Sequence, residues 1–398
     1  MQIQEPRDPK GFALFNLGFR PFFLLSAVAG LVLMALWLMM LGQGNSTHNY
    51  YLLSQYWHGH EMLFGYAIAV IAGFLLTAVR NWTSVQTPYG ATLAGITAVW
   101  VLGRILPLFD TVIPGSIIAL TDLAFLPLVA LGIGIPIIRS GNHRNLVFIV
   151  ILMAMTVANL LVHLQLLGYT ENTLITGLQM ALGLIVVVMV LMGGRVIPFF
   201  TERALGVFQA TKYDWLEKSV LPLAFGWLLA DLLIPQQSEW QIVTYALAAI
   251  NGIVHCIRLH GWFHPRLLRN PLLWVLHIAY LFIPLGFILH ALSGVTDISV
   301  YLSTHAFATG AIGSMTLGMM ARVSLGHTAR PLKVSRLVIA AFLMMALAGA
   351  VRILLPMVPD MYTMALHLSG TLWILAWALF LIPYTPILLR PRMDGQFG

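Results

Sequence analysis

Charged residues are scarce in this chain of 398 residues, because Asp, Glu, Lys and Arg together make up only 9% of it. An ordinary soluble domain has about 25% charged residues, so the composition excludes a soluble fold. Cysteine is nearly absent as well, since Cys256 is the only one. A single cysteine excludes an internal disulfide, a CxxC pair and the CxxCH attachment of a c-type haem. Any metal chemistry therefore has to rely on histidine.

Several common motifs are also missing. The sequence has no P-loop, no GxGxxG pattern behind a strand and no EF-hand loop. A zinc-protease motif fails because His60-Glu61 is followed by Phe64, where HExxH requires a second histidine. Basic residues outnumber acidic ones by 21 to 14, which gives a formal net charge of +7. In a membrane protein this excess is typical of cytoplasmic loops near anionic headgroups, so we expect no nucleic-acid partner.

Long apolar runs, by contrast, fill the sequence. Hydrophobic residues make up 59% of the chain, and the mean hydropathy is +0.88. About 20 consecutive apolar residues are enough to cross the hydrocarbon core of a bilayer. Run length predicts about twelve transmembrane helices, at 20–41, 57–79, 91–109, 115–138, 145–168, 173–199, 217–234, 240–259, 272–292, 301–321, 335–355 and 362–386. The predicted fold is an all-α polytopic membrane bundle that forms a single integral membrane domain over residues 1–398.

The charges in the loops predict the orientation of these helices. Lys and Arg near the ends of membrane helices gather on the cytoplasmic side. With a cytoplasmic N-terminus, all but two of the 21 Lys and Arg residues fall on that side, and the exceptions are Arg104 and Arg352. We therefore predict that both termini are cytoplasmic.

Histidine is frequent for a membrane protein, with 13 residues, although polar side chains are costly in a bilayer. The predicted orientation sorts most of them into two layers, while His48 and His143 are expected in loops. The outer layer contains His58, His60, His163, His290, His305 and His367, and the inner layer contains His255, His260, His264, His277 and His327. Two metal centres near the two membrane faces would produce this pattern, and so would solvated histidines at helix ends.

The outer layer is densest in the run WHGHEM (57–62), where the second predicted helix begins. On a regular helix His58 shares a face with Glu61, whereas His60 points elsewhere. The two histidines therefore either serve different centres or flank a non-helical turn at Gly59. Imidazole is a ligand for haem iron and for copper. Glu61 is a candidate partner for a histidine, a proton carrier or a solvated carboxylate at a helix start.

Other predicted helices carry further ionisable groups in their outer halves, among them Arg104 and Asp122. An arginine inside a membrane needs a counter-ion, which a carboxylate or a haem propionate supplies. His163 follows Asn159 by one turn on the same helix face, so the Asn159 amide is an alternative to a metal as its partner.

His305 precedes a stretch of small residues, 306–313. Such a face suits an axial haem ligand beside a flat porphyrin, and it suits the close approach of another helix equally well. In the inner layer, His277 lies about one and a half turns inside its helix, too deep for solvation by a loop, and His327 follows the tenth helix. His255, His260 and His264 are expected to face lipid headgroups.

Three arginines are candidates for binding anionic haem propionates, namely Arg195, Arg322 and Arg330. Arginines in cytoplasmic loops need no ligand, because the positive-inside rule already accounts for them. The propionate interpretation and the topological one therefore both stay open.

Six segments give the chain a resemblance to the NnrS family: LGFRPFF (17–23), WHGHEMLFG (57–65), GFLLTAV (73–79), GGRVIP (193–198), PLLWVLH (271–277) and GHTARP (326–331). The resemblance covers nearly the whole chain, and several of these motifs are long. Ala329 departs from the family pattern, which more usually has Gly there, but it is not a proposed ligand.

The resemblance implies a twelve-span protein of the bacterial inner (cytoplasmic) membrane that contains haem b and copper and relieves nitric-oxide stress in denitrifying and other bacteria. The family motif positions contain His58, His60, Glu61, Arg104, His163, Arg195, His277, His305, Arg322 and His327. His255, His260, His290 and His367 lie outside these positions.

Our leading hypothesis is a membrane oxidoreductase that binds and removes nitric oxide. An inner haem near His277 and His327 would pass electrons from a quinol or another membrane donor to an outer site. That outer site would lie near His58, His60 and His305, with Glu61 delivering protons. The alternatives are a copper or metal transporter and a haem-based sensor of nitric oxide without turnover.

Overall fold

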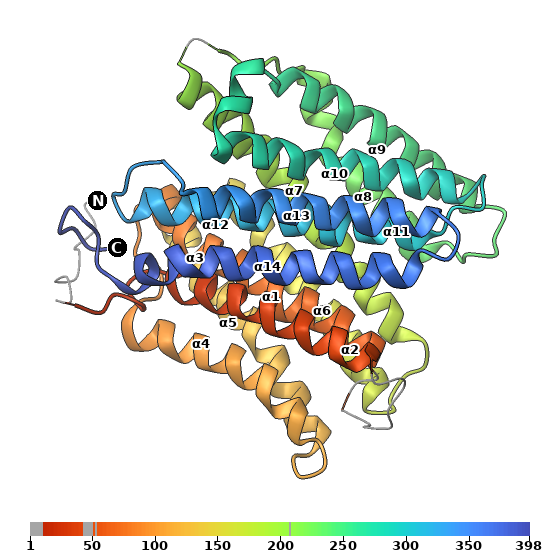
Figure 1. Cartoon of the computed structure of the whole chain (residues 1–398). Helices are drawn as coiled ribbons and strands as arrows, with labels where there is room; N and C mark the ends of the chain where they lie inside the picture. The colour runs from red at the N-terminus through yellow and green to blue at the C-terminus, as the bar shows by residue number, and fades with distance from the viewer. Residues whose placement is uncertain (1–10, 43–50, 52–53, 207) are drawn as a thin grey trace. The chain divides into compact units, whose positions relative to one another are not determined.

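The computed structural model describes residues 11–42, 51, 54–206 and 208–398, and within them it contains helices and no strands (Figure 1). The predicted all-α fold is therefore confirmed. His48 lies outside the described residues. Since a π-helix joins α2 to α3 and another joins α11 to α12, the α-helices of this part of the chain make twelve continuous rods.

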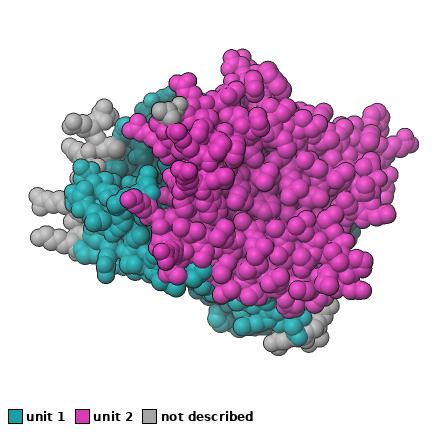
Figure 2. Space-filling model, turned by 45° about the horizontal axis from the view of Figure 1, so that its top comes forward, with its two compact units in different colours: residues 1–181, 320–332, 377–398 teal, residues 182–319, 333–376 magenta. Residues whose placement is uncertain are grey.

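The chain divides into two compact units, which Figure 2 colours separately. Unit 1 comprises residues 1–181, 320–332 and 377–398, and unit 2 comprises residues 182–319 and 333–376. The helices α7 (Thr173–Leu205), α12 (Gly313–His327) and α14 (Tyr362–Leu389) contribute residues to both units. The division does not test the prediction of a single membrane domain, which stays a prediction.

Unit 1 contains the first six α-helices: α1 (Phe19–Gly42), α2 (Ser54–His60), α3 (Ile68–Thr83), α4 (Gly90–Ile105), α5 (Gly115–Arg139) and α6 (Leu146–Leu166). Between α2 and α3 lies the π-helix η1 (Glu61–Ala67). The helix α1 packs closely on α3, because a Cβ added to Gly73 would lie only 2.8 Å from Phe22 Cβ. Similar contacts join α4 to α5 and α5 to α6. Small residues permit such close packing of membrane helices.

The remaining helices of unit 2 are α8 (Asp214–Leu233), α9 (Gln241–Trp262), α10 (Pro271–Ser293), α11 (Val300–His305) and α13 (Arg336–Leu354). The π-helix η5 (Ala306–Ile312) follows α11 and packs on α10 and α13. The helices α9 and α10 lie side by side (Figure 1). Asn270 fixes the start of α10, since its side chain accepts a hydrogen bond from the Leu272 amide and Pro271 occupies the first helical position.

Ten helical segments of the described chain are long and apolar enough to cross a membrane. The chain is thus a multi-pass membrane protein. Two of the twelve predicted spans form helices but do not meet this criterion. The helix α8 carries four charged residues, and the α11–η5–α12 rod is rich in Gly, Ser and Thr. Which side of the membrane the termini occupy stays a prediction.

Candidate metal centre

Three side chains from three helices converge inside unit 1. His60 is the last residue of α2, Asp122 lies in α5 and His163 lies in the last turn of α6. Asp122 Oδ2 is 3.3 Å from His60 Nε2 and 3.1 Å from His163 Nε2, and one ligand atom from each residue lies within 4.8 Å of the others. Two ligands bound tetrahedrally to one metal are about 3.4 Å apart. The spacing and the burial of all three residues therefore fit a shared metal ion.

Each histidine of this group has an oxygen partner on its other ring nitrogen. His60 Nδ1 lies 3.1 Å from Glu61 Oε1, and His163 Nδ1 lies 3.1 Å from the Tyr51 hydroxyl. Burial, and to a smaller extent the Asp122 carboxylate, raises the pKa of the Tyr51 phenol above its ordinary range, so the hydroxyl stays protonated. Metal-binding histidines usually have such a partner, because it fixes the ring orientation and the tautomer.

Arg104 connects the two carboxylates of the cluster. Its Nη1 donates to Glu61 Oε1 at 2.8 Å, and its Nη2 donates to Asp122 Oδ1. The close approach of α4 to α5 permits the second bond, since a Cβ added to Gly103 would lie 2.9 Å from Asp122 Oδ1. The counter-ions of Arg104 are therefore two carboxylates, those of Glu61 and Asp122.

Asn159 completes the cluster from α6. Its Nδ2 donates to Asp122 Oδ2 at 2.9 Å, and its Oδ1 accepts a bond of 2.9 Å from His60 Nε2. The alternative that Asn159 holds His163 is therefore wrong, because the Asn159 amide binds His60 and Asp122 instead. His60 faces an acceptor at each ring nitrogen and consequently carries both protons in this arrangement. A cation bound at Nε2 would take the place of one of these protons.

His60 and Glu61 join the same cluster although they are consecutive in sequence, and they lie where α2 passes into the π-helix η1. Successive residues of a regular α-helix point about 100° apart, and the wider turns of a π-helix change this direction. Trp100 Nε1 donates to the Gly65 carbonyl within η1 at 3.1 Å. Gly65 itself makes room, since a Cβ there would lie 3.0 Å from Glu61 Oε2 and 3.2 Å from Arg104 Nη1.

Comparison with family models gives a match to the NnrS protein family over residues 13–392. The chain belongs to the NnrS family. None of the curated proteins matches it. The match covers both units, and it confirms the resemblance inferred from the six sequence motifs.

Among the candidate residues that this NnrS-family chain shares with the motif pattern, His58 does not join the cluster. The helix continues through Gly59, so the alternative of a non-helical turn there is wrong. His58 is half-buried and stacks on Trp37, with ring centroids 4.6 Å apart and an angle of 11° between the planes. That His58 and His60 serve different metal centres stays a prediction.

His305 is the last residue of α11 and belongs to unit 2, whereas the cluster of His60, Asp122 and His163 belongs to unit 1. Its Nδ1 donates to the Tyr301 carbonyl at 2.7 Å. The small-residue face that follows is covered by side chains: a Cβ on Gly310 would lie 2.4 Å from the Phe282 ring, and one on Gly313 would lie 2.5 Å from the Trp373 ring. Packing of neighbouring side chains thus occupies this face, and the residues there do not fit a porphyrin.

The predicted inner-layer residues fall in different units. His277 and Arg195 are in unit 2, whereas Arg322, His327 and Arg330 are in unit 1. The His277 ring is buried between the carbonyls of Leu273, at 3.0 Å, and Trp262, at 3.3 Å. His327 is half-buried beside Phe19, with ring centroids 5.7 Å apart. The two predicted haem ligands, His277 and His327, thus belong to different units. That they lie near one haem stays a prediction.

His255 was expected to face headgroups, and that expectation is wrong. It is fully buried, and its Nδ1 lies 2.8 Å from the Tyr280 hydroxyl. Tyr280 also accepts from Arg258, which pairs with Glu217. The charges of Arg258 and Glu217 compensate each other. This ion pair and the Tyr280 hydroxyl give the His255 ring polar neighbours inside unit 2, so the ring is buried near this end of α9.

Asp122 is the ligand candidate that sequence analysis undervalued. The sequence marks it as an ionisable group inside a predicted helix, but no spacing pattern connects it to His60 or His163. Tyr51 gave no signal at all, because it precedes the helix and resembles an ordinary loop tyrosine. Only the packing of α4, α5 and α6 on one another brings these side chains together.

Proposed function

We propose that this NnrS-family protein binds nitric oxide at a metal held by His60, Asp122 and His163, and that it reduces the gas there. The observation that carries the proposal is the convergence of two imidazoles and one carboxylate, each imidazole oriented by an oxygen on its far nitrogen. Family membership supports a role in the response to nitric oxide. The proposed location is the bacterial inner membrane.

Copper is the metal that we propose for this site. Imidazole nitrogen suits copper as well as zinc and iron, and copper, unlike zinc, changes its oxidation state and can pass single electrons to the gas. With both protons on His60, the positive charges of Arg104 and His60 balance the negative charges of Glu61 and Asp122, and a metal cation in place of the Nε2 proton would keep that balance. Buried charges need such compensation.

The proposed reaction converts two molecules of nitric oxide and one quinol into nitrous oxide, water and a quinone. The quinol supplies two electrons and two protons, which balances the reaction. Nitric oxide is small and uncharged, so it reaches a site among membrane helices without a polar channel. A bound copper ion would supply the place where the gas binds and accepts electrons.

Within this chain, Glu61 is the group that we propose to carry the protons. Its Oε1 accepts hydrogen bonds from Arg104 and His60. Its Oε2 is buried and has no hydrogen-bond partner among the described residues. Oε2 is therefore the atom that takes up and releases a proton. Arg104 keeps both carboxylates in place throughout.

Haem b is proposed as a second cofactor on the strength of the family resemblance. Its candidate ligands are His277 and His327, with Arg195, Arg322 and Arg330 as candidates for the propionates, whereas the packed face beside His305 leaves that residue out. No step of the proposed reaction depends on where such a haem lies. A pyridine haemochrome spectrum of the purified protein tests this part, and the absence of a b-type spectrum would exclude it.

The function is tested with the full-length protein in mild detergent. Copper and iron are quantified, and consumption of nitric oxide with a reduced quinol is followed at an electrode. We expect turnover in the wild type, loss of turnover and of one metal equivalent in His163→Gln, and wild-type behaviour in His143→Gln, which alters an exposed histidine of the same unit. Equal turnover in wild type and His163→Gln would refute the proposed site.

Two further assays, one in detergent and one after reconstitution into sealed vesicles, separate the two alternatives. A sensor would bind nitric oxide, seen as a spectral change, but would not consume it with quinol present. A metal transporter would instead move copper into sealed vesicles that contain the protein. Copper uptake without consumption of nitric oxide would replace our proposal by the transporter.

A further inference from the structure

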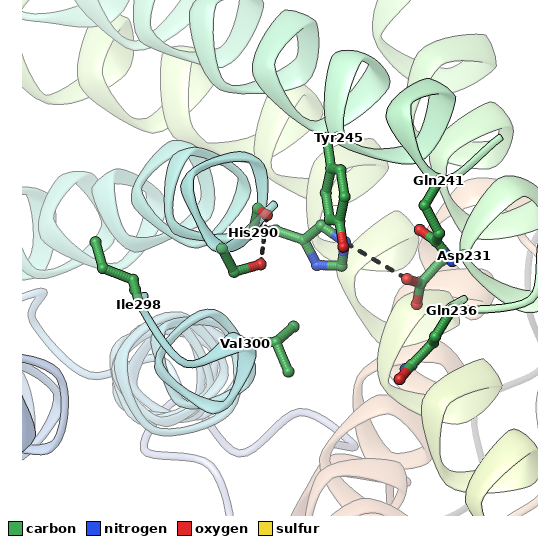
Figure 3. Close-up of a pocket in the computed structure, with 8 residues that line it drawn as sticks. Asp231, Gln236, Gln241, Tyr245, His290, Ile298 and Val300 are labelled. Atoms are coloured by element: carbon green, nitrogen blue, oxygen red, sulfur yellow. Dashed lines mark hydrogen bonds and ion pairs between the residues drawn. The ribbon is translucent and has the colours of Figure 1, made fainter. Parts of the chain in front are cut away.

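Unit 2 contains a polar pocket at the ends of α8, α9 and α10 (Figure 3). Its volume is about 240 Å³, and the residues that line it include Asp231, Gln236, Gln241, Tyr245 and His290. Water occupies about 30 Å³ per molecule in the liquid. The pocket therefore has room for a metal ion together with several water molecules.

His290 is the central side chain of this pocket (Figure 3). It is only 6% exposed, yet neither of its ring nitrogens makes a hydrogen bond to another described residue. Asp231 Oδ1 lies 3.5 Å from His290 Nε2, which is an ion-pair distance. A good N–H···O bond measures about 2.7–3.2 Å, so this pair is too far apart for one.

The same distance is the one expected for two ligands of a single metal ion. A histidine nitrogen and a carboxylate oxygen, each about 2.1 Å from a tetrahedral metal, lie about 3.4 Å apart. Trp227 supports the His290 ring edge to face, with centroids 5.4 Å apart and an angle of 89° between the planes. This contact packs the Trp227 indole against the His290 imidazole on the pocket wall.

The remaining polar groups of the pocket are uncharged. Gln241 Nε2 donates to the Ile234 carbonyl at 2.9 Å, which leaves its Oε1 available as an acceptor. Tyr245 lies with its ring centroid 6.0 Å from that of His290. Asp231 is the single carboxylate among the lining residues. A bound cation would compensate its charge.

We infer that this pocket is a second metal site, in which His290 Nε2 and Asp231 Oδ1 bind a divalent transition-metal cation and water completes the coordination. One imidazole and one carboxylate suit a borderline ion such as Cu²⁺ or Zn²⁺. The site is independent of the cluster of His60, Asp122 and His163, because it uses no residue of unit 1.

The test uses Cu²⁺ as an EPR-visible probe, added to the full-length protein in detergent. Bound metal is counted after dialysis, and the nitrogen hyperfine pattern reports imidazole coordination. We expect His290→Gln and Asp231→Asn each to lose one equivalent relative to the wild type, and His290→Gln to lose the corresponding nitrogen signal.

The matched controls are His367→Gln and Asp297→Asn, since both residues are exposed and belong to the same unit. They should bind as much Cu²⁺ as the wild type. Asp231→Asn preserves side-chain size, so it provides a folded sample even where His290→Gln elutes as an aggregate. An unchanged Cu²⁺ count and spectrum in Asp231→Asn would overturn the inference, whatever the outcome for His163→Gln.

Discussion

Arg104 Nη1 and Glu61 Oε1 are 2.8 Å apart, and the same Glu61 oxygen faces His60 Nδ1 at 3.1 Å. One carboxylate oxygen thus connects a guanidinium to a candidate metal ligand. The position of a metal on His60 therefore depends on Arg104, although Arg104 contacts no proposed metal itself.

Replacement of Arg104 should destabilise the protein strongly. Arg104→Gln leaves Glu61 and Asp122 as buried carboxylates without their cation, and breaking a buried pair of this kind costs about 3–5 kcal/mol. Thermal unfolding in detergent measures the loss. The control is Arg139→Gln at an exposed position. Equal melting temperatures for the two variants would show that the Arg104 bridge does not stabilise the fold.

Glu61→Gln should separate proton delivery from metal binding. The amide has nearly the shape of the carboxylate and still accepts from Arg104, but it does not carry a proton at neutral pH. We expect normal copper content and consumption of nitric oxide reduced on the order of 100-fold, a typical effect of losing a general acid or base. Glu171→Gln, at an exposed position, should leave the rate unchanged. Full activity of Glu61→Gln would assign the proton path to another group.

Gly65→Ala tests the space around the cluster. The added methyl group would lie 3.0 Å from Glu61 Oε2 and 3.2 Å from Arg104 Nη1, so it should displace the carboxylate and weaken metal binding. Gly95→Ala is the control, because no heavy atom lies within 4 Å of its added Cβ. That control should be neutral or stabilise the helix by about 0.5–1 kcal/mol. If both variants keep the same metal affinity, the space at Gly65 is not required.

Tyr51→Phe tests the partner of His163. The substitution removes the hydroxyl that lies 3.1 Å from His163 Nδ1 and preserves the ring. Loss of such a partner typically lowers metal affinity 10–100-fold. A competition titration with a copper chelator measures the change, and Tyr169→Phe, at an exposed position, serves as the control. An affinity equal to that of the control would show that His163 needs no partner.

The residues of the cluster illustrate how far sequence reasoning extends. His60, Glu61, Arg104 and His163 were singled out because ionisable groups inside membrane helices require a reason. Their mutual contacts were not predictable, since a hydrogen bond between α4 and α5 depends on how two helices pack. The small-residue stretch at 306–313 shows the same limit, because its sequence suits a flat ligand and a neighbouring helix equally.

By itself, the sequence determined that the chain is a helical membrane protein and where its helices run. The reason is that the length of an apolar run is a local property, and a run of about 20 residues matches the thickness of the hydrocarbon core. It also determined the family, through motifs that need no structure. The tertiary structure decided which polar groups share a site. Glu61, the first residue of the π-helix η1, lies beside His60, and the packing of α4, α5 and α6 adds Asp122, His163 and Arg104. These contacts join residues up to about 100 positions apart, and only the folded chain brings them within bonding distance.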